Sequence, residues 1–183
     1  QRVLVNGELT AAFPVGPGAT ALGEVLSVQP ASRKRAVVLG YGAMDLAADR
    51  GERYGRVDIR GRDPAGFEVL KRAMGGSGIA PGKIPAFVAA DPAMGPEGVG
   101  STDLIVVAGP EPMTLSGNRF WTSEFFRRCR DALAAGGVVA VPIRAGRDAI
   151  PQTTVSLGRS IWQTLSSEVG PVVAIPGSVA WLL

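Results

Sequence analysis

The side chains of this chain that could do chemistry are mainly carboxylates, because its 183 residues include no histidine and a single cysteine, Cys129. Ser-His-Asp and Cys-His nucleophile systems are therefore excluded. The ligands of a typical zinc site are missing too, so we expect no metal. Proton transfer would fall to Asp, Glu, Lys, Tyr or Cys. One cysteine allows no intrachain disulfide, so nothing here points to an oxidising compartment.

Four segments carry glycines or carboxylates shortly after predicted strands. They are Gly40-Tyr41-Gly42, Asp63, Asp91 and Glu111. Ligands of open α/β sheets bind at the carboxyl ends of the strands. The segments in which we expect a site are residues 40–44, 60–64, 90–92 and 107–120.

Three of these features also have a purely structural interpretation. A single Gly-x-Gly pattern is typical of a plain turn from strand to helix. Asp63, followed by Pro64, fits the N-cap of a helix. Asp91 could equally cap a turn before Pro92.

The elements that must position these segments alternate between strand and helix from Ala36 onward. We predict strands over residues 36–39, 56–60, 84–89, 103–107, 138–143, 172–175 and 179–183, and helices over 19–28, 43–50, 64–74, 122–134 and 154–167. Such alternation predicts an α/β fold with a mostly parallel sheet and helices on both faces. Pro176-Gly177 predicts an antiparallel hairpin at one edge. Asn6-Gly7, between short β-prone runs over 2–5 and 9–13, predicts a small N-terminal β-hairpin.

Charge and hydropathy limit the partners. The net charge is +3, and the cluster Arg33-Lys34-Arg35 is better explained by the solvated beginning of a strand than by a nucleic-acid patch. No apolar run reaches 18 residues, the length that predicts a membrane-spanning helix. Because the chain begins with Gln1, we expect it to be part of a longer protein whose remainder could contain membrane spans.

The order of elements and the motifs resemble spermidine synthases, and most closely a branch of spermidine synthase-like domains often fused to membrane segments. The family patterns YDVIIVDLPDP, NRFYTxEFF and LxPGGVL have counterparts in this chain. These are Asp103-Leu-Ile-Val-Val-Ala-Gly-Pro110-Glu-Pro112, Asn118-Arg-Phe-Trp-Thr122-Ser-Glu-Phe-Phe126 and Leu133-Ala-Ala-Gly-Gly-Val-Val139. The tail and the N-terminal hairpin match as well, so the resemblance covers nearly the whole chain.

The resemblance implies the Rossmann-like fold that spermidine synthases share with S-adenosylmethionine-dependent methyltransferases. It implies an N-terminal β-hairpin and loop over 1–18 and the main domain over 19–183. The family transfers an aminopropyl group from decarboxylated S-adenosylmethionine to putrescine, so one of these forms of S-adenosylmethionine is the implied cofactor. A homodimer, and a cytoplasmic domain attached to membrane-spanning segments outside this chain, are also implied.

Carried over residue by residue, the resemblance shows losses at the site. Ala108 occupies the position of the proton acceptor, while Glu111 keeps a carboxylate nearby. Gly61 occupies the position of the acid that holds the cofactor ribose. Asp91 can fill the place of the acid that reads the adenine edge.

The remaining candidates are weaker. For the cofactor they are Gly40, Gly42 and Asp63, with Tyr41 departing from the family's GGGxG loop. For the substrate they are Glu111 and Asn118. We expect Arg119, next in the chain, to form a structural ion pair.

These losses favour a domain without catalytic activity that acts as a scaffold or as a docking or ligand-binding module. The alternative is an aminopropyl- or methyl-transferase with an altered substrate, which would rely on Asp91, Glu111 and the turn glycines. A third hypothesis is that the pocket binds an anionic or apolar ligand with the help of Arg60 and Arg62, although exposure to solvent explains these two arginines more simply.

Overall fold

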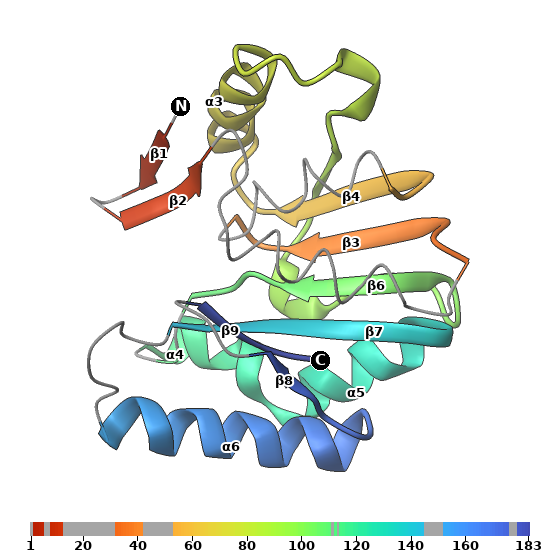
Figure 1. Cartoon of the computed structure of the whole chain (residues 1–183), viewed down its shortest axis with the longest axis vertical. Coiled ribbons are helices and arrows are strands. Elements are labelled where there is room, and N and C mark those ends of the chain that lie inside the picture. Colours follow the sequence, from red (N-terminus) through yellow and green to blue (C-terminus); the bar gives the residue numbers. More distant parts are fainter. Residues whose placement is uncertain are drawn as a thin grey trace.

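The computed structural model describes residues 2–5, 8–12, 32–41, 53–110, 112, 114–144, 152–175 and 179–183. In this part of the chain a seven-stranded sheet has the order β5-β4-β3-β6-β7-β9-β8. Its strands are β3 (Arg35–Leu39), β4 (Arg56–Gly61), β5 (Ala86–Ala89), β6 (Thr102–Val107), β7 (Leu133–Arg144), β8 (Ala174–Ile175) and β9 (Val179–Leu182). The first five are parallel, and β9 pairs antiparallel with both β7 and β8. This confirms the mostly parallel sheet with an antiparallel C-terminal pair (Figure 1).

Two further strands, β1 (Arg2–Val5) and β2 (Glu8–Ala12), form a separate antiparallel pair. Val5 pairs with Glu8, which confirms the predicted N-terminal hairpin. The helices predicted over 19–28 and 43–50, and the domain boundary at residue 18, lie outside the described residues.

The longer helices of the described chain are α3 (Pro64–Gly75), α5 (Ser123–Ala132) and α6 (Gln152–Glu168). Short turns of 3₁₀-helix are η1 (Pro81–Lys83), η2 (Pro92–Met94) and η3 (Arg119–Trp121). The predicted loop before Arg119 instead contains a helical turn, α4 (Leu115–Asn118), because the Thr114 hydroxyl caps the Gly117 N–H at 3.0 Å. None of the described helices is both long and apolar enough to cross a bilayer.

The sheet carries a core layer on each face. One layer joins Phe67, Leu70 and Met74 of α3 to inward side chains of β3, β4 and β6. The other joins Phe125 and Phe126 of α5, and residues of α6, to the opposite sides of β3, β6 and β7. Strands buried on both faces read as continuous apolar runs, which is why β3 and β6 could be predicted.

Several predicted boundaries are wrong by two residues or more. The largest difference is at β7, which was predicted from residue 138 and begins at Leu133, because Leu133 already pairs with Thr102 of β6. The helix predicted to reach Ala134 ends at Ala132, because the N–H groups of Gly100 and Ser101 bond to the Asp131 and Ala132 carbonyls, each at 3.0 Å. The strand predicted from Ile84 begins at Ala86, because η1 precedes it.

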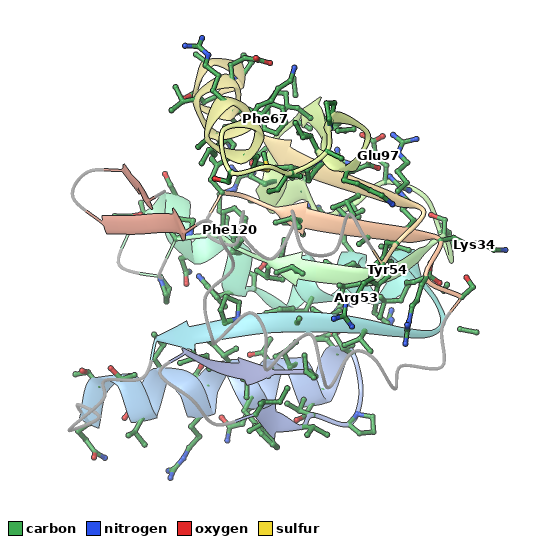
Figure 2. All side chains as sticks on the ribbon, turned by 45° about the horizontal axis from the view of Figure 1, so that its top comes forward. Lys34, Arg53, Tyr54, Phe67, Glu97 and Phe120 are labelled. Carbon is green, nitrogen blue, oxygen red and sulfur yellow. The ribbon has the colours of Figure 1, made fainter. Side chains whose placement is uncertain are left out.

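The topology fixes where a site can lie. From β3 the chain runs outward through β4 to β5 and then returns to β6 on the other side of β3. The carboxyl ends of β3 and β6 therefore form the point where the strand order reverses, and ligands of such sheets bind there. In Figure 2 Phe120 lies toward these carboxyl ends, and Lys34 lies at the opposite ends of the strands.

Candidate functional site at the carboxyl edge of the sheet

The backbone closes tightly where β3 and β6 end. Gly40 has φ +100°, a conformation that L side chains rarely adopt. A Cβ at this position would lie 2.5 Å from the Ala108 carbonyl oxygen. The Gly40 N–H bonds to the Arg60 carbonyl and the Ala108 N–H to the Leu39 carbonyl, both at 2.9 Å. Packing of the two strand ends is thus enough to require this glycine.

Tyr41 fills the space at the end of β4. A Cβ on Gly61 would lie 2.5 Å from the Tyr41 Cζ atom, so the ring rests directly on this glycine. The Tyr41 hydroxyl donates to the Asp63 carbonyl at 2.5 Å and accepts the Asp63 N–H at 3.1 Å. The ring therefore occupies the space into which a larger side chain at position 61 would extend.

The contacts between Tyr41 and Asp63 explain the pKa of the one side chain and the role of the other. Desolvation raises the pKa of the Tyr41 phenol and the nearby Asp63 charge adds to this, although the hydrogen bond with the Asp63 backbone works against it. Asp63 is the N-cap of α3, because its carboxylate accepts the Ala65 N–H at 3.0 Å. The structural interpretation of Asp63 is thus confirmed.

The two residues that follow β6, Ala108 and Gly109, have no titratable side chain. Ala108 is buried, and it presents a methyl group where the resemblance expects a proton acceptor. A Cβ on Gly109 would lie 2.5 Å from the ring of Phe120, so this aromatic ring covers the strand end. Phe120 belongs to the core layer with Phe125, as its edge-to-face contact at 5.6 Å shows.

Asp91 joins the loops that follow β4, β5 and β6. Its Oδ2 atom accepts from Arg62 at 2.5 Å and from Arg119 at 2.7 Å. Its Oδ1 atom accepts the Ala93 N–H at 3.1 Å, capping η2. Of the two alternatives left open for Asp91, the structure shows the cap. The ion pair predicted for Arg119 is confirmed, and it involves the same carboxylate.

The pKa of Asp91 lies below its ordinary value. Partial burial would raise this pKa, but the hydrogen bonds from Arg62, the Ala93 N–H and Arg119 outweigh that effect. The carboxylate is therefore ionised at neutral pH, and two guanidinium groups already occupy its Oδ2 atom.

Arg60 does not lie exposed beside Arg62, so the simpler explanation given for it was wrong. The alternation of side chains along β4 turns Arg60 to the face that also holds Leu39, where it is 4% exposed. Its Nη2 atom bonds to Glu97 at 2.9 Å, and its Nε atom has no hydrogen-bond partner. Arg60 is therefore not available to a ligand at this edge.

The other predicted candidates divide between described and undescribed residues. Asn118 is exposed at the end of α4, and its N–H bonds to the Thr114 carbonyl at 2.8 Å. Gly42 and Glu111 lie outside the described residues. Cys129 is buried in the core, and burial raises the pKa of its thiol well above the ordinary value, which leaves it unreactive.

Several contacts of the site were not predicted from the sequence. They join residues that lie at least 11 positions apart in the sequence. Tyr41 contacts Gly61, Phe120 contacts Gly109, and Asp91 pairs with two arginines. One signal was available, because a glycine at the end of β4 and another just after β6, the two strands that flank β3, each leave room that an aromatic ring can fill.

Comparison with known proteins gives the fold a precedent. No protein-family model matches the sequence, and neither does any curated protein. Among solved structures, a probable spermidine synthase from Corynebacterium glutamicum matches with a TM-score of 0.70 and 19% identity, over 99% of this chain and 71% of that one. Human methyltransferase-like protein 13 in complex with SAH matches with a TM-score of 0.58 and 19% identity, over 90% and 77%.

A spermidine synthase in complex with the transition-state analogue AdoDATO matches with a TM-score of 0.59 and 14% identity, over 81% of this chain. This chain spans about half of that enzyme's length, 53%. At these identities the likeness concerns the fold. The chain therefore has the methyltransferase-type fold of spermidine synthases.

Proposed function

We propose that this chain is a spermidine synthase-like domain that has lost aminopropyl transfer and serves as a scaffold, or as a docking or ligand-binding module, of a larger protein. The observation that carries the proposal is the packing of the Tyr41 ring directly against Gly61. There the family resemblance expects an acid that holds the cofactor ribose, and this chain has instead an aromatic ring with both hydrogen bonds of its hydroxyl satisfied by Asp63.

The loss of the proton acceptor supports the same conclusion. The methyl group of Ala108 cannot accept a proton from an attacking amine, and general-base catalysis needs a correctly placed acceptor. A diamine also needs carboxylates around its two ammonium groups once they leave water. At this edge Arg62 and Arg119 already occupy Asp91, so their positive charges would repel a diamine.

The direct test is binding and turnover by the purified chain. We expect calorimetry to show no heat with S-adenosylmethionine, its decarboxylated form or methylthioadenosine, and we expect no product from decarboxylated S-adenosylmethionine with putrescine. Spermidine formed above the rate without protein would refute the loss of catalysis.

A second test asks whether Tyr41 is the block. The double variant Y41G/G61E removes the ring and restores an acid at the end of β4. We therefore expect it to show heat with methylthioadenosine at concentrations where the unchanged chain shows none, because one charge-assisted hydrogen bond raises affinity by about tenfold or more. The matched control is Tyr41→Phe, which keeps the ring and loses only the hydroxyl, and it should bind no better than the unchanged chain. Equal affinity in all three proteins would show that Tyr41 does not close the site.

The alternative is a transferase with an altered substrate. It is favoured by the solved neighbours in complex with AdoDATO and SAH, and by the survival of Asp91 and Gly40 at their expected positions. The calorimetric experiment separates the two proposals, because heat with S-adenosylmethionine in the unchanged chain supports the transferase.

The assembly is a proposal as well. We propose a homodimer and a cytoplasmic domain attached to membrane-spanning segments outside this chain, with the main domain beginning near residue 19. Sedimentation of the purified chain tests the dimer, and a monomer at all accessible concentrations would exclude it. The full-length sequence tests the attachment.

A further inference from the structure

Three arginines from different elements converge beside η2 at the carboxyl edge of the sheet. Arg62 follows β4, Arg119 lies in η3 and Arg128 lies in α5. Arg62 and Arg119 share the Oδ2 atom of Asp91 at 2.5 and 2.7 Å. Arg119 and Arg128 both donate to the Met94 sulfur, at 3.8 and 3.5 Å. We call Arg62, Arg119 and Arg128 the arginine cluster.

The arginine cluster has more donors than its surroundings satisfy. Each guanidinium group has five N–H donors, whereas a thioether sulfur is only a weak acceptor. Arg128 is exposed and makes no ion pair with any described residue, although Glu124 lies one turn before it on α5. Arg62 and Arg119 thus share the single charge of Asp91, and Arg128 pairs with no described carboxylate, so positive charge is in excess at the arginine cluster.

Two of the three guanidinium groups of the arginine cluster are held in place before any ligand binds. Asp91 fixes two of the guanidinium groups and is itself fixed by the Ala93 N–H. Arg62 and Arg119 nevertheless keep 62% and 44% of their side-chain surface exposed. A ligand from solvent would thus meet oriented donors with little further loss of side-chain entropy.

We propose that the arginine cluster is a binding site for a phosphoryl group, carried by a small ligand or by a lipid headgroup. A phosphoryl group brings three acceptor oxygens and up to two negative charges, which match the spare donors and the excess charge. Guanidinium groups suit this ligand because their donors lie in a planar fork. The site lies at the rim of the proposed degenerate edge, and it does not depend on whether the domain turns over a substrate.

The test measures binding of inorganic pyrophosphate by calorimetry, together with sedimentation of vesicles of phosphatidylcholine that contain a minor share of phosphatidylinositol phosphate. We expect the variant R119Q/R128Q to bind the probe at least about tenfold more weakly than the unchanged chain, because two charge-assisted contacts are lost. The matched control is R72Q/R159Q, which removes the same charge from exposed positions on α3 and α6, and its affinity should be unchanged.

The single variant Arg128→Gln guards against misfolding, because Arg128 makes no ion pair in the described chain. It should keep the thermal unfolding midpoint and still bind the probe more weakly. Loss of pyrophosphate binding in R119Q/R128Q supports a free phosphoryl ligand, and loss of vesicle binding alone supports a lipid headgroup. Binding of neither probe by the unchanged chain, or equal weakening in R72Q/R159Q, would overturn the proposal.

Discussion

Single residues decide what the carboxyl edge of the sheet can hold. Gly61 has no side chain, so the Tyr41 ring can settle on it and bond to Asp63 on both sides of its hydroxyl. Gly40 lets the ends of β3 and β6 approach until only a hydrogen fits between them. A change of one side chain at either position alters the edge without altering the sheet.

The tight approach at Gly40 predicts a large cost for a methyl group. Gly40→Ala should lower the free energy of unfolding by about 3 kcal/mol or more, because the left-handed backbone and the clash with the Ala108 carbonyl add together. Chemical denaturation measures this loss.

The control for this prediction is Gly78→Ala. Gly78 has φ +83°, and a Cβ there would meet no atom within 4 Å. Its substitution should cost about 1 kcal/mol, the price of the backbone conformation alone. Equal losses at Gly78 and Gly40 would show that the strand ends do not press on each other.

At the scale of elements, the carboxylate of Asp91 joins three of the loops that leave the carboxyl edge of the sheet. Asp91 follows β5, and its partners Arg62 and Arg119 belong to the segments after β4 and β6. These segments leave the sheet at β4, β5 and β6, and β4 and β6 lie on opposite sides of β3. The ion pairs therefore help to set the spacing of the loops around the edge.

Replacement of Asp91 should make this contribution visible in the pH dependence of stability. Asp91→Asn keeps an oxygen for the Ala93 N–H and loses the charge, so we expect a loss of about 0.5 to 1 kcal/mol at pH 7. The folded protein lowers the pKa of Asp91 from 3.8. Its stabilisation is therefore present above the unfolded pKa and disappears as the pH falls through the folded value.

Unfolding curves of both proteins between neutral pH and about pH 2 measure this difference, with about pH 4 as the point where it should begin to shrink. Glu68→Gln serves as the control, since its pair with Lys71 on α3 is half exposed and should change stability by less than about 0.5 kcal/mol. A difference between Asp91→Asn and the unchanged chain that stays constant down to pH 2 would contradict the role of the charge.

The whole molecule is a sheet between two core layers, and its edge site depends on both. The layer with α5 and α6 holds Phe120, which lies toward the carboxyl ends of the strands (Figure 2). Tyr41 packs against the layer with α3, and it bonds to Asp63, the N-cap of that helix. The same packing that stabilises the fold therefore places the aromatic rings of Tyr41 and Phe120 over the carboxyl edge of the sheet.

Loss of a ring from the α5 layer should accordingly be expensive. Phe126 is 0% exposed and packs edge-to-face on Phe125 at 5.4 Å, so Phe126→Ala should cost about 3 to 5 kcal/mol. Trp162→Ala on α6 is the control, because Trp162 is 38% exposed and should cost about 1 kcal/mol or less. Thermal unfolding followed by circular dichroism would compare them, and similar midpoints for the two variants would argue against this core.

The sequence by itself determined the central strands of the sheet, the three longer helices that the structure describes and the cap of α3. The apolar runs at 36–39 and 103–107 predicted β3 and β6 to within one residue, because strands buried on both faces need unbroken apolar side chains. Asp63-Pro64 predicted the start of α3, because a cap depends on neighbours in the chain.

Only the tertiary structure decided what the edge contains. The Tyr41 ring on Gly61, the buried side of Arg60 and the two arginines on Asp91 each depend on strands or loops that meet from distant parts of the chain. Sequence patterns report the period of one element, whereas these contacts depend on the order and register of the strands. That order brings Tyr41 into contact with Gly61. The ring therefore fills the space at the end of β4 where the motifs alone allowed a cofactor site.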